Sequence, residues 1–124
     1  NGDIIVNEIA PRPHNSGHLT IESCYTCQFE QHIRAILNLP LGNSKMKTPA
    51  VMVNLIGNEN HTGPVYYKNI DQILAIDSVI PHIYGKKETR PYRKMGHVTV
   101  LDSQIQKALQ IAKKIKKTIK VISK

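Results

Sequence analysis

Apolar residues recur along this chain with two different periods, and prolines and glycines separate the resulting segments. Short apolar runs of strand length predict strands, whereas apolar residues spaced three and four apart predict helices. The predicted strands are residues 4–9, 50–56, 80–84 and 94–101, and the predicted helices are residues 24–37, 70–76 and 103–119. This order of strands and helices indicates a mixed α+β fold.

The two longer helices are predicted to be amphipathic, which is typical of helices that pack on a core. The apolar face of the first is Phe29, Ile33, Ile36 and Leu37, and that of the last is Ile105, Ala108, Leu109, Ala112, Ile115 and Ile119. Pro40 and Gly42 end the first helix. Ser103, followed three residues later by Gln106, predicts a capping box at the start of the last helix.

The composition is that of an ordinary globular domain, with 124 residues of which 40% are hydrophobic and 21% are charged. No apolar run approaches the roughly 20 residues of a membrane-spanning helix. Two cysteines are too few for a disulfide-stapled secreted module, so we expect a reducing compartment, the cytoplasm. The chain starts without methionine and runs at once into an apolar segment, so we expect it to be part of a longer polypeptide.

The net charge of +8 is concentrated at the end of the chain. Residues 103–124 hold seven lysines and no acidic residue, so the preceding residues hold the other ten of the 17 basic residues and all nine acidic residues. A docked helix with a solvated lysine face explains this pattern most simply. Contact with RNA or with a membrane surface is the alternative use of such a face.

A first polar cluster follows the first predicted strand and spans residues 7–18. Glu8 is a candidate Mg²⁺ ligand, because Mg²⁺ prefers carboxylate oxygens. Arg12 is a candidate anion clamp, since a planar guanidinium can donate two parallel hydrogen bonds. Together they supply the components of a metal-bridged phosphoryl or acyl-phosphate site. A plain surface turn with a Glu–Arg pair is the alternative.

Two further clusters contain candidate ligands. His14 and His18, followed by Cys24 and Cys27, have the ligand types of a zinc site. Their spacing is poor, however, and intracellular cysteines are usually small buried apolar residues. Residues 85–97 carry five cations within nine residues, between two predicted strands. Such a loop can bind a phosphate, and a solvated hairpin or a nucleic-acid contact is the alternative.

Several motifs, taken in order, resemble a known family of ligases. They are Asn-Glu-Ile-Ala-Pro-Arg-Pro-His-Asn-Ser-Gly-His at residues 7–18, Gln-Phe-Glu-Gln-His-Ile-Arg-Ala at 28–35, Leu-Pro-Leu-Gly at 39–42, Val-Met-Val-Asn-Leu-Ile-Gly at 51–57, His-Ile-Tyr-Gly-Lys at 82–86 and Arg-Pro-Tyr-Arg-Lys-Met-Gly-His at 90–97. The chain over about residues 3–102 resembles the 5-(carboxyamino)imidazole ribonucleotide synthase family, the ATPase subunits of phosphoribosylaminoimidazole carboxylase, within the ATP-grasp superfamily.

The resemblance implies that the chain is the C-terminal third of such an enzyme. Residues 1–37 would be the C-terminal part of the ATP-grasp domain. Residues 38–124 would be the small strand-rich C-terminal domain, a rudimentary single hybrid motif with flanking helices that ends in the basic amphipathic helix. The missing N-terminal part of the same polypeptide is then the main partner, a homodimer is one option, and neither nucleic acid nor a membrane is expected.

The reaction implied by the resemblance consumes ATP in the presence of Mg²⁺. Bicarbonate attacks the γ-phosphate to form carboxyphosphate and ADP. The amine of aminoimidazole ribonucleotide then takes the carboxyl group, and phosphate is released. We expect the isolated chain to be inactive, because the adenine pocket, the phosphate lid and the first metal-binding acid of the family fall outside the region of resemblance.

Residue roles at the ATP end follow from the same resemblance. Asn7 and Glu8 line the ATP–Mg²⁺ site, with Glu8 as the metal ligand. Arg12 holds bicarbonate or carboxyphosphate. His14 and Asn15 line the same pocket near the acceptor amine.

The resemblance assigns the 5′-phosphate of the ribonucleotide to Lys86 and Arg93, with Lys94 adjacent. Two positions depart from the wider pattern. Ala10 stands where many ATP-grasp enzymes have Asn, a feature that this subfamily shares, and Tyr92 stands where family members often have Gly. The cysteine pair has no role in the family pattern.

Two alternatives remain at this stage. The formate-dependent glycinamide ribonucleotide transformylase family has a similar Pro-Arg-Pro-His loop, but it tends to continue Asp-Thr-Gly-Met where this chain has Asn-Ser-Gly-His at residues 15–18. A basic RNA-binding module is the alternative from a different class, and it predicts an affinity that falls steeply with salt.

Overall fold

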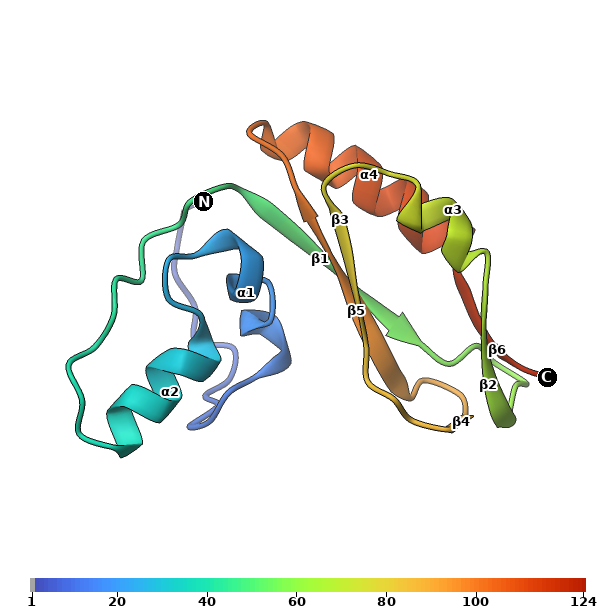
Figure 1. Ribbon diagram of the computed structural model, residues 1–124, viewed down its shortest axis with the longest axis horizontal. Coiled ribbons are helices and arrows are strands. Elements are labelled where there is room, and N and C mark those ends of the chain that lie inside the picture. The colour runs from blue at the N-terminus through green and yellow to red at the C-terminus, as the bar shows by residue number, and fades with distance from the viewer. Residues whose placement is uncertain (1) are drawn as a thin grey trace.

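The computed structural model describes residues 2–124 and confirms the α+β class (Figure 1). In chain order, the elements are the short 3-10 helix η1 (Asn15–Gly17), α1 (Thr20–Ser23), α2 (Gln28–Ile36), β1 (Ala50–Ile56), β2 (Gly63–Lys68), α3 (Ile70–Leu74), β3 (Val79–Ile83), β4 (Glu88–Thr89), β5 (Lys94–Leu101), α4 (Ile105–Thr118) and β6 (Lys120–Ser123). None of the helices within these residues is both long and apolar enough to span a membrane.

The central sheet has one apolar and one polar face. Its strands are antiparallel in the order β1, β5, β3. The register places Val53 opposite Val98, whereas the neighbouring position pairs Asn54 with His97 and His97 with His82. Because successive side chains of a strand point to opposite faces, the valines lie on one face and this Asn–His–His row lies on the other.

Helix α4 covers the apolar face of the central sheet, with α3 beside it (Figure 1). The core contains Val53, Leu55, Ile73, Met95, Val98, Val100, Ala108, Ala112, Ile115, Ile119 and Val121. Lysines of α4, such as Lys113 and Lys117, are exposed. The structure therefore confirms a docked amphipathic helix whose lysines face the solvent.

The end of the chain differs from the prediction, which placed the basic helix last. Helix α4 stops at Thr118, and β6 follows and pairs antiparallel with β2. Strand β2 also pairs with β4, which gives a second small sheet in the order β4, β2, β6. Val121 is 2% exposed in this sheet. The pairing partner of β6 lies more than fifty positions earlier in the chain, so local periodicity did not reveal it.

The strand predicted over residues 4–9 is wrong, because this segment forms no strand in the structure. Ile4, Ile5 and Val6 are 80–100% exposed. A strand needs a neighbour whose backbone groups satisfy its own, and no segment within residues 2–124 pairs with this one. The apolar pattern was recognised correctly, but the element it predicts requires a partner.

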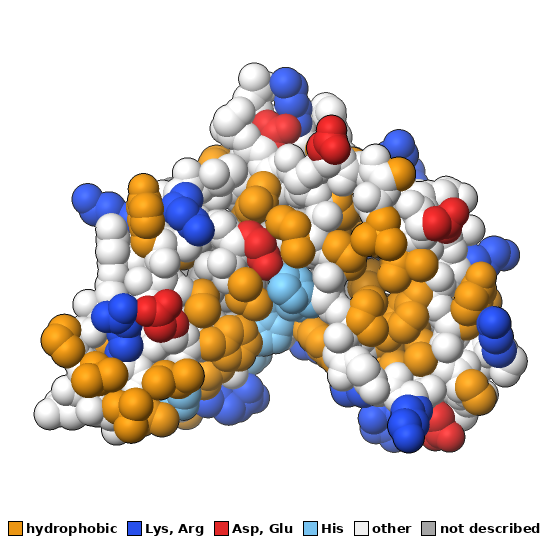
Figure 2. All heavy atoms as spheres, viewed as in Figure 1, with side chains coloured by type: hydrophobic (Ala, Val, Ile, Leu, Met, Phe, Trp, Pro, Cys, Tyr) orange, Lys and Arg blue, Asp and Glu red, His pale blue; other side chains and the backbone are white. Residues whose placement is uncertain are grey.

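The helix predicted over residues 24–37 begins later than expected. Helix α1 ends at Ser23, and α2 begins after Cys27, so both cysteines lie outside α2. Cys24 is buried and forms an isolated antiparallel bridge with Met46. The predicted apolar face of α2 is largely solvent-exposed, with Ile36 67% exposed, and Figure 2 shows hydrophobic side chains gathered on this side of the molecule.

The predicted capping box at Ser103 is also wrong. The residue that caps α4 is Gln104, which makes no side-chain capping bond. Its backbone N–H donates instead to Asp102 Oδ1 at 2.8 Å. The strands over residues 50–56 and 94–101 are confirmed with their predicted bounds, and β3 and α3 differ from prediction by one or two residues.

Candidate functional site

The loop that carries His14 and Asn15 is held in place by Gln28 of α2. Gln28 Oε1 accepts from the backbone N–H of His14 at 2.9 Å, and its Nε2 donates to the His14 carbonyl at 2.8 Å. A Cβ at Gly17 would approach Gln28 Oε1 to 2.5 Å, so the close packing of loop and amide requires glycine there. His14 caps η1, accepting at Nδ1 from the Ser16 backbone N–H.

Glu8 and Arg12 project from the chain that leads into this loop. Glu8 Oε1 lies 3.6 Å from His14 Nε2, and the Glu8 side chain is 64% exposed. Asn7 is exposed on the same extended approach. Arg12 is exposed, and its Nη1 donates to the Pro13 carbonyl at 3.1 Å. The structure thus groups Glu8 with His14 and leaves the Arg12 guanidinium open to a ligand.

Lys86 and Arg93 belong to the loop between β3 and β5. Lys86 Nζ donates to the Lys94 carbonyl at 2.7 Å and lies 5.8 Å from the centre of the Tyr84 ring. Arg93 Nη1 donates to the Glu88 carbonyl at 2.9 Å. Both side chains are therefore held against the backbone of one loop. Tyr92 of the same loop has a φ of 61° and donates its hydroxyl hydrogen to Glu59.

The two loops converge on Tyr84, which directly follows β3. The centroid of the His18 ring lies 6.3 Å from that of the Tyr84 ring, and the Lys86 ammonium lies over the same Tyr84 ring. His14 and Lys94 are both near enough to His18 to disfavour its protonation. Residues far apart in sequence are thereby brought to one region of the molecule.

Three histidines that were not predicted as site residues occupy the join between these loops and the sheet. We call His18, His82 and His97 the histidine cluster. The His97 ring stacks on His82, with centroids 4.4 Å apart and planes 11° apart, and its centroid lies 5.0 Å from that of His18. Figure 2 shows histidine side chains in the notch between the side formed by α1 and α2 and the side formed by the sheets.

Each member of the histidine cluster has a hydrogen-bonding partner. His97 Nδ1 bonds to the Tyr84 hydroxyl at 3.0 Å, His82 Nε2 to Glu22 Oε1 at 2.6 Å, and His18 Nδ1 to Gln28 Nε2 at 2.8 Å. Glu22 comes from α1, so its bond to His82 of β3 joins the helical segment to the central sheet, whereas the bond between His18 and Gln28 lies within the helical segment.

Burial controls the charge of the histidine cluster. His97 is 2% exposed. Desolvation, with smaller contributions from His82 and His18, lowers the pKa of His97 to about 4 despite the opposing effect of Glu22. Burial also lowers the pKa of His18, and it raises the pKa of Tyr84, where the adjacent Asn15 side chain acts in the opposite direction. At neutral pH, His97 and Tyr84 are therefore both uncharged.

Several buried polar atoms around the cluster form no hydrogen bond of ordinary geometry within residues 2–124. They are Asn15 Nδ2, Glu22 Oε2, Asn54 Oδ1, His97 Nε2 and Thr99 Oγ1. Unpaired buried groups are costly, and three of them, on Asn54, His97 and Thr99, lie on the face of the central sheet opposite the apolar core.

Sequence reasoning missed the histidine cluster because its members come from three separate segments. His82 and His97 both lay in predicted strands, but only the register makes them direct neighbours. One signal was available in the sequence. His82 and Tyr84 are two positions apart in a predicted strand, so their side chains are expected on the same face of the sheet. His18 had been considered only as a zinc ligand. Among residues 2–124 no group of three or more His, Cys, Asp or Glu is arranged to hold a metal ion.

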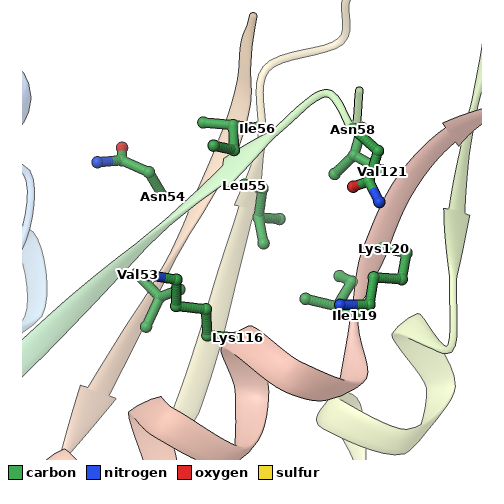
Figure 3. A pocket seen from close by; sticks show the side chains of 9 residues that line it. All are labelled: Val53, Asn54, Leu55, Ile56, Asn58, Lys116, Ile119, Lys120 and Val121. Atoms are coloured by element: carbon green, nitrogen blue, oxygen red, sulfur yellow. The ribbon is translucent and has the colours of Figure 1, made fainter. Parts of the chain in front are cut away.

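A partly open pocket lies elsewhere. One cavity of about 140 Å³ lies between β1, the end of α4 and β6, and its lining includes Leu55, Ile119 and Lys116 (Figure 3). No predicted site residue lines it. A shallow surface groove beside α2 includes Arg12, Pro13 and Gln28, which places one predicted anion ligand at an open surface.

Two family patterns match this chain. The phosphoribosylaminoimidazole carboxylase C-terminal domain matches residues 50–111, and the ATP-grasp domain matches residues 1–29. A curated relative, the N5-carboxyaminoimidazole ribonucleotide synthase of Bacillus subtilis, is 49% identical over 100 residues, which are 81% of this chain and 25% of that protein. The chain thus spans about a quarter of the length of this relative.

Solved structures give the same similarity. The N5-carboxyaminoimidazole ribonucleotide synthetase of Thermotoga maritima is 59% identical with a TM-score of 0.95, covering 99% of this chain and 34% of that chain. The synthase of Aspergillus clavatus, solved in complex with ADP and 5-aminoimidazole ribonucleotide, is 34% identical with a TM-score of 0.73, covering 86% of this chain and 28% of that chain.

Proposed function

This chain belongs to the family of the phosphoribosylaminoimidazole carboxylase C-terminal domain, and we propose that it is the C-terminal part of an ATP-dependent carbon–nitrogen ligase. The ligase would carboxylate aminoimidazole ribonucleotide with bicarbonate. The convergence of the loop over residues 11–18 with the loop over residues 85–94 at Tyr84 carries this proposal, since it brings the loop that holds His14 and Asn15 beside the loop that holds Lys86. The ligand named for the Aspergillus clavatus relative supports the choice of ribonucleotide.

The proposed reaction has two steps. A bicarbonate oxygen attacks the γ-phosphorus of ATP, which gives carboxyphosphate and ADP. The amine nitrogen then attacks the carboxyl carbon, the bond from that carbon to the phosphate oxygen breaks, and phosphate leaves with the amine proton. The two free cysteines fit a reducing compartment, and we place the ligase in the cytoplasm.

Arg12 is the proposed ligand of bicarbonate and carboxyphosphate. Its exposed guanidinium uses Nη1 for the Pro13 carbonyl, and the fork geometry of the group suits a planar anion. Glu8 and Asn7 would line the ATP site. An exposed carboxylate such as Glu8 fits Mg²⁺, which is usually held by one or two carboxylates together with substrate phosphates. When bound, the metal would neutralise charge on the phosphates.

Lys86 and Arg93 are the proposed ligands of the ribonucleotide phosphate. Each donates to a backbone carbonyl of the same loop, which restricts the side chain before the substrate arrives. Restricting a flexible cation in advance lowers the entropy cost of binding an anion. His14 and Asn15 would then lie near the amine that accepts the carboxyl group.

The test is a steady-state assay of ADP formation by the intact protein. We expect turnover to require bicarbonate together with aminoimidazole ribonucleotide, and not formate with glycinamide ribonucleotide. Arg12→Ala should lower kcat by about 100-fold, on the scale of a lost charge-stabilising donor. Lys86→Ala should instead raise KM for the ribonucleotide by about 10-fold, because it removes ground-state binding.

Matched surface variants control for loss of charge alone. Arg34→Ala removes an α2 arginine that pairs with Glu30, and Lys117→Ala removes an exposed α4 lysine. Both should keep wild-type kinetics. ADP formation with formate and glycinamide ribonucleotide in place of the expected pair would overturn the proposed function, as would unchanged kinetics in both Arg12→Ala and Lys86→Ala.

A further inference from the structure

The turn that carries Arg93 is bonded to a residue from a distant part of the chain, Gly57. The Gly57 backbone N–H donates to the Arg93 carbonyl at 2.9 Å, and the Tyr92 backbone N–H donates to the Gly57 carbonyl at 2.9 Å. Gly57 is buried and directly follows β1. The next residue, Asn58, donates its backbone N–H to the Val121 carbonyl of β6 at 2.9 Å. The backbone of the turn is therefore fixed to the end of β1 and, through it, to β6.

This close packing leaves no room for a side chain at Gly57. A Cβ there would collide with the Arg90 carbonyl and would approach Thr89 Oγ1 to 2.5 Å. The Arg90 carbonyl also accepts from the Arg93 backbone N–H at 3.1 Å, which closes the turn. Only glycine lets the two segments approach this closely, so Gly57 determines where the turn lies.

Tyr92 is bound to the same segment by its side chain. Its φ of 61° lies in the left-handed region, which a residue with a Cβ adopts only at a cost in free energy. Such a conformation persists where the surroundings determine it. The Tyr92 hydroxyl donates to the carboxylate of Glu59, two positions after Gly57 in the loop between β1 and β2. This bond offsets part of the cost of the left-handed conformation.

We call Gly57, Glu59 and Tyr92 the turn clamp. We propose that the turn clamp is a set of positioning residues that holds Arg93 in place for the phosphate of the ribonucleotide. The proposal rests on the proposed function. Arg93 Nη1 donates to the Glu88 carbonyl at 2.9 Å, and its other N–H groups can donate to an anion. Because the turn clamp fixes the backbone of Arg93, loosening it should weaken binding of the phosphate and leave the chemical steps unchanged.

The experiment measures steady-state kinetics of two Tyr92 variants of the intact protein. Tyr92→Phe loses the bond to Glu59 but keeps the cost of the left-handed conformation, so KM for the ribonucleotide should rise at least threefold while kcat changes less than twofold. Tyr92→Gly loses the same bond, but glycine adopts a positive φ readily. Its KM should therefore stay within twofold of the wild type. An equal rise of KM in both variants would mean that the hydroxyl itself binds the substrate, and would overturn the proposal.

A double variant tests whether Tyr92 acts through Glu59. Glu59→Ala should raise KM as much as Tyr92→Phe does, and combining the two substitutions should cause no further rise. Independent, multiplying effects would overturn the proposal. Tyr25→Phe is the matched control, because Tyr25 lies between α1 and α2 and is 63% exposed, close to the 65% of Tyr92. It should keep wild-type kinetics.

Amide hydrogen exchange without substrate separates this inference from the proposed function. Tyr92→Phe should raise the exchange rate of the Gly57 amide, which donates to Arg93, at least threefold, whereas Tyr25→Phe should not. If the wild type does not turn over with bicarbonate and aminoimidazole ribonucleotide, the proposed function fails and the role of the turn clamp toward the phosphate fails with it. If the wild type does turn over, an unchanged exchange rate or an unchanged KM in Tyr92→Phe would overturn the inference and leave the proposed function in place.

Discussion

The imidazole of His97 shows how packing decides the charge of a single residue. It is 2% exposed and is flanked by two further histidines and one carboxylate, Glu22, which bonds to His82. Desolvation outweighs the favourable effect of that carboxylate and lowers the pKa of His97 to about 4. A histidine in an unfolded chain has a pKa near ~6.5, so folding and protonation of His97 oppose each other.

This opposition predicts a loss of stability in mild acid. Between about pH 6.5 and pH 4 the unfolded state binds the proton that folded His97 excludes, so the free energy of unfolding falls as pH falls through this window. A shift of this size corresponds to at most about 3 kcal/mol. His18, whose pKa is also lowered, contributes in the same direction. Urea denaturation of the chain at a series of pH values measures the effect.

His97→Asn isolates the contribution of His97, because carboxylates titrate in every variant. The free energy of unfolding of His97→Asn should change less between pH 6.5 and pH 4 than that of the wild type. His32→Asn, which replaces an exposed histidine of α2, should keep the wild-type slope. An equal slope in His97→Asn and the wild type would contradict the prediction.

The candidate site residues were predictable from the sequence to different degrees. Glu8, Arg12, His14 and Asn15 lie within eight positions of one another, so their closeness along the chain sufficed to group them. The histidine cluster was not predictable in this way. Its members are separated by up to 79 positions, and their proximity follows from the β3–β5 register and from the packing of α1 on the sheet.

At the scale of elements, periodicity predicted those helices and strands that bury one face. Helix α4 buries Ala108, Ala112 and Ile115 against the central sheet and exposes its lysines. Strands β1 and β5 were predicted with their bounds because each is rich in β-branched and other apolar residues, such as Val51 and Val53 in β1 and Val98 and Val100 in β5. Strands β2 and β6 were missed because apolar and polar residue types do not alternate along their sequences, and their existence depends on pairing with each other.

The docking of α4 predicts the cost of truncating its central side chain. Ile115 is fully buried among core residues of β1 and β5, so Ile115→Ala should lower the free energy of unfolding by about 2–5 kcal/mol through lost burial and a residual cavity. Ile105→Ala is the matched control on the same helix. Ile105 is 43% exposed, so its truncation should cost less than about 1 kcal/mol. Urea denaturation of both variants provides the comparison, and equal losses would mean that α4 is not docked through Ile115.

At the scale of the whole molecule, the location of positive charge separates structural from functional cations. The lysines of α4 are exposed on the solvent side of a helix whose other side packs on the core. Arg12, Lys86 and Arg93 are fewer, but each is held by a bond to a backbone carbonyl of its own loop. The net charge of +8 therefore describes mainly the helix surface and gives little support to the RNA-binding alternative.

The exposure of the predicted ATP ligands leads to a prediction for the 124-residue chain by itself. Glu8 and Arg12 are both exposed, and the pocket that Arg12 lines is a shallow, open groove. Carboxyphosphate formation needs a site that excludes water, so we expect no ADP formation above background in the presence of bicarbonate and aminoimidazole ribonucleotide. A coupled ADP assay on the purified chain provides the measurement, and substrate-dependent turnover would contradict the expectation.

The sequence by itself determined the α+β class, the family, the amphipathic helix and the polar cluster from Asn7 to His18. Each of these features is recognised from residues that are close together along the chain. The tertiary structure alone decided three things: that residues 4–9 form no strand, that β6 follows α4, and that His97 stacks on His82 and lies beside His18 and Tyr84. The physical reason is common to all three. Strand pairing and side-chain desolvation depend on a partner elsewhere in the chain. Local periodicity does not identify which segment that partner is.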